Sequence, residues 1–321
     1  MNSLRKMATM LAFGLILPLS SLANGYPDRP ITIIVPYPPG GQMDQHTRLY
    51  GLQLSEKLGQ PVVVQNKPGA EAIIGLNELA KSSPDGYTLA AANFGTHALN
   101  PHLYDLPFDT VESFTPVMQM TRAPQVLLVA ADSPFSTLED LLDFARAHPT
   151  DVNFGSVNTH SQLYGELLAA GADVKFTYIP HKGSADSLLS LLRGDIGFYW
   201  DSATSAITQL SGKKVRALAI TGTSRLEAIP DVPTVSERGI KGLEFNSWFG
   251  IFAPAGLPEP ILNKLSDELF IIVNSERTRE VVVPAGNEVS GVRGEEFRKI
   301  IKDNRDLAGR AAEQAGIERK K

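Results

Sequence analysis

Residues 31–44 read ITIIVPYPPGGQMD, and this stretch indicates the fold: an apolar run, a turn rich in proline and glycine, and the start of a helix. The run ITIIV is typical of a strand that is buried on both faces, as the strands of parallel sheets are. In an open parallel sheet, ligands bind beyond the carboxyl ends of the strands, which is where this turn lies. The turn is therefore the first candidate for a binding site.

Two properties of the turn PYPPGGQMD (36–44) favour an anion as its ligand. The adjacent glycines Gly40 and Gly41 let the backbone approach a ligand closely, and the first N–H groups of the next helix point outward without partners. These donors and the helix dipole attract a carboxylate or a phosphate. Asp44 stands where a capping residue is expected. A tight turn with a capping aspartate is the alternative, and the pattern is neither GxGxxG nor a P-loop.

The segments after the turn alternate between helix and strand patterns. A helix is predicted over 44–58, a strand over 61–64, a helix over 70–81 and a strand over 87–92. This β-α-β-α-β order implies right-handed crossovers and a parallel sheet.

A second α/β unit is predicted over about residues 123–241, after which the chain returns to the first unit. Ser136–Glu139 forms a capping box that opens a helix ending near His148. Further elements of the second unit are strands near 125–130, 152–155, 174–179, 196–200 and 215–220, and helices near 160–170, 184–193 and 203–211. Beyond it, a strand is predicted over 245–253 and helices over 258–274 and 294–315. The fold class is α/β, with two lobes and a ligand cleft between them.

The composition indicates a soluble globular chain. Of its 321 residues, 43% are hydrophobic and 20% are charged, which suits about two domains. There is no cysteine, which excludes disulfides, cysteine catalysis and cysteine-rich zinc sites. The formal net charge of −5 and the lack of a basic run argue against nucleic-acid binding.

Residues 1–23 are predicted to be a signal peptide. Arg5 and Lys6 precede the short apolar stretch MATMLAFGLILPLS, and Ser21–Ala23 supplies the small residues of a cleavage site. An uncleaved anchor is the alternative, although the stretch is short for a membrane span. Cleavage near Asn24 would change the formal net charge from −5 to −7 and leave no membrane-spanning segment.

Other polar residues follow predicted strands at the same sheet edges. Asn93 and Thr96 follow the third strand, and Asp201 ends the strand IGFYWD. The second-unit candidates are Asn158, Thr159 and His160 in SVNTHSQ (156–162), and Gly183 and Ser184 in HKGSADS (181–187), with Ser184 the expected helix cap. For each of these residues, ordinary turn or capping chemistry is the alternative to ligand binding.

Motifs of enzymes are missing from the sequence. It contains no GxSxG, HExxH or Walker pattern, and its six histidines are scattered without metal-ligand spacing. We therefore predict no catalytic residue, no metal and no cofactor.

The whole sequence resembles the extracytoplasmic receptors of the tripartite tricarboxylate transporter family, over about residues 26–315. The motifs that carry the resemblance are YPDRPITIIVPYPPGGQMD (26–44), LGQPVVVQNKPGA (58–70), SPDGYTL (83–89), VRALAITGTSRLEAIPDVPT (215–234) and SWFGIFAPAGLP (247–258). Each motif is fairly specific, and their order along the chain makes the set very specific.

The resemblance implies a type II, Venus-flytrap periplasmic binding protein that closes over a small carboxylate. Lobe 1 would combine residues 24–122 with 242–321, lobe 2 would span 123–241, and the crossings near 120 and 242 would be the hinge. The loop Tyr37–Asp44 would hold one ligand carboxylate through backbone N–H groups and waters. Tyr37 would pack against the ligand body and Thr96 would add a hydrogen bond, while 156–162, 182–185 and Asp201 would complete the site.

Several residues depart from the family pattern at the predicted mouth of the cleft. Gln42 and Met43 replace a small residue or Thr before Asp44, and Glu71 and Ala72 stand where glycines are usual. SVNTHSQ is about two residues shorter than the usual loop and lacks its glycines, and Asp186 replaces a proline. These changes bear on the size of the ligand and on the chemistry of its second end.

The expected function is to capture a small organic carboxylate in the periplasm and deliver it to membrane transporter subunits. The alternative is a carboxylate sensor that signals through a sensor protein, and a periplasmic enzyme is a more distant third. We expect a monomer. The sequence does not name the ligand, because recognition by backbone and water leaves little side-chain signature.

Overall fold

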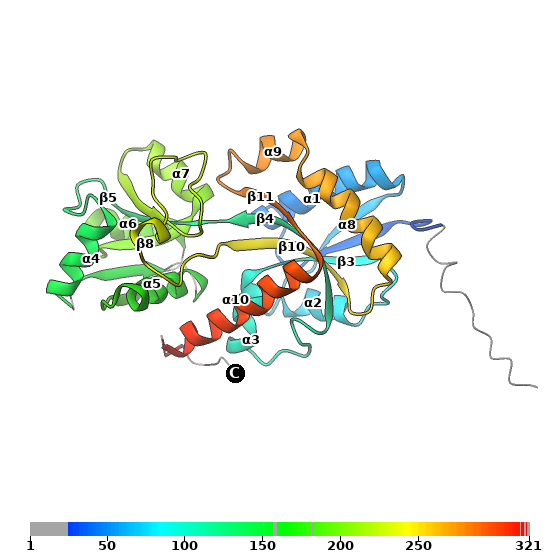
Figure 1. The fold of residues 1–321 in the computed structure, drawn as a ribbon, viewed down its shortest axis with the longest axis horizontal. Helices are drawn as coiled ribbons and strands as arrows, with labels where there is room; N and C mark the ends of the chain where they lie inside the picture. The colour runs from blue at the N-terminus through cyan, green and yellow to red at the C-terminus, as the bar shows by residue number, and fades with distance from the viewer. Residues whose placement is uncertain are drawn as a thin grey trace, which may run out of the picture.

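The computed structural model describes residues 25–149, 151–156, 159–181, 183–314, 316–317 and 319, without the side chains of 159, 160 and 314. The predicted signal peptide, Asn158 and the side chains of Thr159 and His160 lie outside this description. Figure 1 shows two α/β units side by side along the long axis of the molecule. No helix among the described residues is long and apolar enough to cross a membrane.

The first unit is built on a six-stranded sheet in the order β11-β4-β10-β3-β1-β2. Its strands are β1 (Ile31–Val35), β2 (Val62–Asn66), β3 (Thr88–Asn93), β4 (Phe114–Ala123), β10 (Ser247–Pro254) and β11 (Glu288–Val292). The predicted parallel pairing holds for β1 with β2 and β3. The sheet as a whole is mixed, because β10 runs antiparallel to β3 and β4, and β11 runs antiparallel to β4.

The second unit has a five-stranded sheet in the order β7-β6-β8-β5-β9. Its strands are β5 (Gln125–Ala130), β6 (Asn153–Ser156), β7 (Thr177–Pro180), β8 (Phe198–Ser202) and β9 (Val215–Ile220). Strand β6 pairs in parallel with β7 and β8, whereas β5 is antiparallel to β8 and β9. The two sheets with interleaved helices confirm the predicted α/β class.

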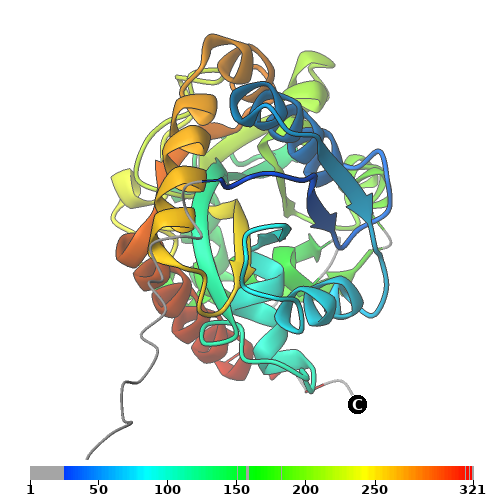
Figure 2. The ribbon, with the colours of Figure 1, turned by 90° about the vertical axis from the view of Figure 1, so that its right-hand side faces the viewer.

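Helices cover the sheets on both faces. They are α1 (Gln42–Leu58), α2 (Ile73–Ala80), α3 (Asn100–Leu103), α4 (Leu138–Ala147), α5 (Thr159–Ala172), α6 (Ser184–Arg193), α7 (Ala203–Ser211), α8 (Glu259–Val273), α9 (Glu276–Val282) and α10 (Gly294–Gln314), with a π-helix at Gly95–Leu99. Figure 2 looks onto the first unit and shows α1 and α8 on one face of its sheet, with α2 and α10 on the other. Each pair buries its apolar side chains against the sheet in a separate core cluster.

The two units are joined by strands and by a shared apolar core. Strand β4 continues into β5 through Pro124, and the chain returns to the first unit just before β10. Helix α10 runs beneath β4 and β10 and packs on α5 of the second unit (Figure 1). At the junction the ring of Phe245 stacks between Phe94 and Tyr164, at centroid distances of 5.1 and 5.4 Å. We propose that the lobe boundaries are those the sequence predicts, 24–122 with 242–321 and 123–241.

Candidate ligand-binding site

The turn between β1 and α1 exposes the amino terminus of a helix. Gly40 has φ +89°, a left-handed backbone that favours glycine, and Gly41 caps α1 in an extended conformation with φ −73°. The backbone N–H groups of Gly41, Gln42 and Met43 donate to no group in the described part of the chain. The positive end of the 17-residue helix therefore carries unpaired donors at the carboxyl edge of the sheet.

Asp44 braces this turn from inside the first helical turn. Its carboxylate accepts the Gly40 N–H at 2.9 Å, the Asn66 amide at 2.9 Å and the Arg48 Nε at 3.1 Å. Burial alone would raise the pKa of Asp44, but the hydrogen bonds from Arg48, Gly40 and Asn66 together hold that pKa below its usual value. Asp44 is thus an ionised brace, and the predicted cap position belongs instead to Gly41.

Tyr37, Asn93 and Thr96 form a connected polar group beside the turn. The Asn93 amide donates to the Tyr37 hydroxyl at 3.3 Å, and the Thr96 N–H donates to Asn93 Oδ1 at 3.0 Å. The Thr96 side chain is buried, and its hydroxyl contacts the Asn93 backbone and the His97 ring. Burial chiefly raises the pKa of Tyr37; Asn93 opposes this and nearby Glu71 adds to it, so the phenol stays a neutral donor.

Asp201 ties together two helix starts in the second unit. Its carboxylate accepts the Ser184 hydroxyl at 3.0 Å, the Ser202 N–H at 2.8 Å and the Gln209 amide at 2.9 Å. Ser184 is the first residue of α6, and the predicted cap position belongs to Gly183. Because Asp201 is buried and fully engaged, it positions the amino termini of α6 and α7.

A hydrogen bond between α1 and α7 shows that the two groups of residues lie at one junction. The side chain of Gln42, the first residue of α1, donates to the Thr204 hydroxyl in α7 at 3.1 Å. Tyr37, Gly40, Gly41, Asp44, Asn93 and Thr96 lie on the first-unit side, and Gly183, Ser184 and Asp201 on the second-unit side. Helix α5 starts at Thr159 and follows the end of β6, where Ser156 and Ser161 contact each other at 3.0 Å.

The sequence analysis does not predict three residues of this region, Asn66, Gln42 and Thr204, as site residues. Asn66 ends β2 at the same sheet edge, so its strand-end position was a usable signal. Gln42 stands out as a departure from the family pattern, but nothing in the sequence indicates its partner. Thr204 carries no signal, because its role depends on how the two units meet.

The arrangement suits recognition by hydrogen bonds. Within the described residues no group of three or more His, Asp or Glu side chains is placed to hold a metal ion. The carboxylates of Asp44 and Asp201 are occupied by protein donors. The unpaired donors are backbone N–H groups, which bind an anion without a cationic side chain.

Comparison with known proteins gives the family of the chain. The family model described as the tripartite tricarboxylate transporter family receptor matches residues 47–317. A UPF0065 protein from a Pseudomonas species is 34% identical over 282 residues, which cover 87% of this chain and 84% of that protein.

Two solved structures share the fold and are named with their ligands. An R. palustris protein solved with adipate is 30% identical, with a TM-score of 0.75 over 92% of this chain and 100% of that one. MatC from Rhodopseudomonas palustris, solved with bound malate, is 28% identical, with a TM-score of 0.69 over 89% and 99% of the two chains.

The family is one of periplasmic solute-binding receptors and not of enzymes, which confirms the expectation of a receptor. The family match spans most of the chain, and the relatives and the shared fold agree with it. This chain therefore belongs to the tripartite tricarboxylate transporter family of receptors.

Proposed function

We propose that this protein captures a small organic carboxylate in the periplasm and delivers it to a membrane transporter of the tripartite tricarboxylate type. The observation that carries the proposal is the amino terminus of α1, whose unpaired N–H groups stand behind a turn braced by Asp44. The two similar structures solved with adipate and with malate contain small organic carboxylates, which supports a ligand of this class.

The first carboxylate would bind to the backbone N–H groups of Gly41, Gln42 and Met43. These donors are fixed before the ligand arrives, because Asp44 holds the Gly40 N–H and Asn66 holds both Asp44 and the Tyr37 carbonyl. A preorganised site loses little entropy on binding. The Gly40 N–H is already engaged, so Gly40 shapes the turn by its left-handed backbone.

The second end of the ligand would meet the second unit. Asn158, Thr159, His160, Gly183 and Ser184 remain the proposed contacts, with Asp201 holding Ser184 in place. Tyr37 and Asn93 would lie along the ligand body, and Thr96 would act through Asn93.

A thermal-shift screen of residues 24–321 against a carboxylate library, with adipate and malate included, tests the proposal. A ligand at 100 times its dissociation constant stabilises the folded state by about 2.7 kcal/mol, so a shift that grows with concentration identifies it. Stabilisation by non-anionic compounds alone would remove the carboxylate from the proposal.

The α1 site is tested by Gly41→Asp, with Gly41→Asn as the matched neutral control. A side chain fits at this position, because the nearest atom to an added Cβ is the Pro38 carbonyl oxygen at 4.0 Å. Calorimetry should show that Gly41→Asp binds a carboxylate about tenfold or more weakly than Gly41→Asn does. The negative side chain of Asp would repel the ligand and offset a charge-assisted hydrogen bond worth roughly 1.5–3 kcal/mol. Equal affinities of the two variants would place the carboxylate elsewhere.

Delivery is tested in cells. Uptake of the identified carboxylate should fall in a strain that lacks this gene and recover when the gene is restored. Unchanged uptake would mean that the protein does not supply a transporter, and would favour the alternative of a carboxylate sensor.

A further inference from the structure

The hydroxyl of Thr204 in α7 bonds to two separate parts of the first unit. It accepts the Gln42 side-chain amide at 3.1 Å and donates to the Ala285 carbonyl in the α9–β11 loop at 2.5 Å. The buried Asn287 amide adds a longer contact to the same hydroxyl at 3.4 Å. One second-unit side chain thus fastens the start of α1 and the loop before β11.

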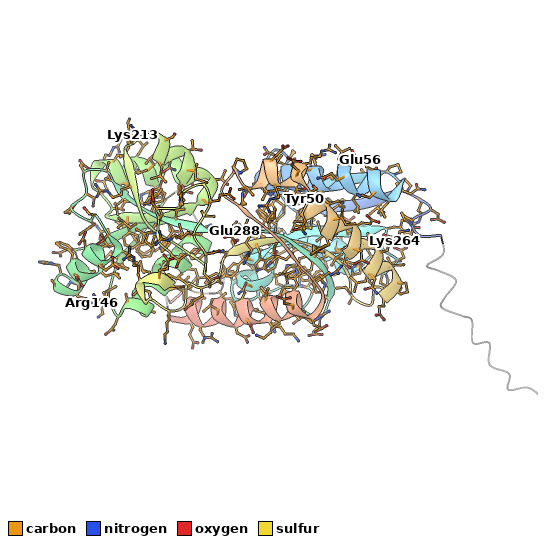
Figure 3. All side chains as sticks on the ribbon, turned by 45° about the horizontal axis from the view of Figure 1, so that its top comes forward. Tyr50, Glu56, Arg146, Lys213, Lys264 and Glu288 are labelled. Atoms are coloured by element: carbon orange, nitrogen blue, oxygen red, sulfur yellow. The ribbon has the colours of Figure 1, made fainter. Side chains whose placement is uncertain are left out.

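Close packing surrounds these hydrogen bonds. A Cβ added at Gly286 would lie 2.6 Å from the Ile207 side chain and 2.9 Å from the Ala203 Cβ, so the loop backbone rests directly on α7. One residue beyond Asn287, Glu288 accepts the Ser224 hydroxyl at 3.0 Å and pairs with Arg122 at 3.1 Å. Figure 3 shows Glu288 at the junction of the two units.

The Thr204 contacts, like the Ser224–Glu288 hydrogen bond beside them, differ in kind from the covalent and apolar connections between the units. Strands β4 and β10 join the units covalently, and α10 with Phe245 joins them through apolar packing. The Thr204 bonds are few, polar and partly exposed to water. A change in the spacing of α1 and α7 would break these bonds before it disturbed the apolar core.

We propose that Thr204 is a latch that holds the two units at the spacing described here, and that the receptor uses the latch to retain its ligand. Thr204 is a positioning residue, because it fixes the distance between the α1 amino terminus and the α6 and α7 amino termini without needing to touch the ligand. The effect on affinity rests on the proposed function. The effect on spacing does not.

The latch sets the fraction of molecules in the binding-competent arrangement. The apparent dissociation constant equals the intrinsic one divided by that fraction, so a lost latch weakens binding even when every ligand contact survives. The bound molecule would also open more readily, so the change should appear mainly in the dissociation rate.

Spacing is measured without any ligand by pulsed electron-electron spin resonance. The natural chain has no cysteine, so Lys57→Cys on α1 and Lys214→Cys before β9 supply the only two label sites. Thr204→Val should lengthen or broaden the distance distribution, and Thr204→Ser should restore it. Thr208→Val is the matched control, because Thr208 lies one turn further along α7 and its hydroxyl donates to the Thr204 carbonyl within the same helix. Identical distributions for Thr204→Val and Thr208→Val would overturn the latch.

Gln42→Ala removes the same hydrogen bond from the first-unit side. It therefore controls for a folding defect that is specific to Thr204→Val. Both variants should shift the label distance in the same direction, and the double variant should shift it by less than the sum. Purely additive shifts would mean that Gln42 and Thr204 do not act through one bond, which contradicts the latch.

Affinity for adipate and malate separates the latch from the proposed function. If either probe binds the natural protein, Thr204→Val should weaken it about five- to tenfold, mostly through faster dissociation, and Thr208→Val should not. If neither probe nor any other carboxylate binds, the proposed function fails while the label distances still decide the latch.

Discussion

His97 is a buried, neutral imidazole in the core of the first unit. Its ring centroid lies 4.3 Å from that of Phe252, its Nδ1 contacts the Thr96 hydroxyl, and its Nε2 has no hydrogen-bond partner among the described residues. Burial lowers the pKa of His97 to about 3, with a small opposing contribution from Asp109. The histidine that follows Thr96 in the sequence therefore belongs to the core.

This burial predicts a loss of stability in mild acid. Below about pH 6.5 the unfolded chain binds a proton on His97 and the folded chain does not, so stability falls as the pH drops towards 3. Between pH 7.5 and 5 the loss from this residue should be about 2 kcal/mol. Urea unfolding at both pH values should show that His97→Phe removes that part of the difference.

The exposed, non-titratable Ile74 offers the control, because Ile74→Val should leave the difference between the two pH values as it is in the natural protein. If His97→Phe also left it unchanged, the acid sensitivity would have to come from other groups. His46 is one of these, because burial lowers its pKa to about 4.

At the scale of elements, local sequence patterns predict helices and strands better than they predict which strands pair. The sequence locates β1, its turn and α1, because apolar runs, glycines and helix periodicity act over neighbouring residues. It misses β4, which contains Pro116, and β11, and it gives no strand directions for β5 and β10, which depend on distant pairing.

The predicted helices start within three residues of the observed ones, and those predicted to start at residues 184, 203 and 294 start there. The capping box of α4 uses Thr137 and Asp140, one position beyond the predicted pair. Residues 70–72, predicted as helix, form a left-handed run before α2 begins at Ile73. The hydrogen bond between Gln42 and Thr204 could not be predicted from local patterns, because the two residues are 162 positions apart in the sequence.

The two glycines of the turn should respond differently to alanine. Gly40→Ala forces a side chain into the left-handed region and should destabilise the protein by about 1–2 kcal/mol. Gly41→Ala keeps an ordinary backbone and should destabilise the protein by less than about 1 kcal/mol, because alanine caps a helix less well than glycine but loses no side-chain bond here. Urea unfolding of the pair measures the contrast, and equal losses would contradict the turn geometry.

At the scale of the whole molecule, the apolar core makes the two units one cooperative structure. The largest core cluster includes Phe94 of the first unit, Tyr164 of the second and Ile301 of α10. We therefore expect the two sheets, despite their separate topologies, to unfold in one cooperative transition.

Phe245→Ala should weaken this coupling. Its ring stacks nearly flat on both neighbours, with interplanar angles of 15° and 17°. Truncating it should destabilise the protein by about 2–4 kcal/mol and should split or broaden the calorimetric transition. Phe270→Ala, on the exposed side of α8, should leave a single sharp transition. A single sharp transition for Phe245→Ala would show that the units are coupled elsewhere.

The donors at the start of α1 belong to the main chain, and only an exchange for proline can delete them. A receptor anchored as we propose would keep its hold on a carboxylate while residues such as Glu71 and Asp186 change around it. One scaffold can therefore be retuned from one acid to another by substitutions at the rim. For the design of biosensors, Glu71 and Asp186 are positions to vary, and the turn braced by Asp44 is the part to keep unchanged.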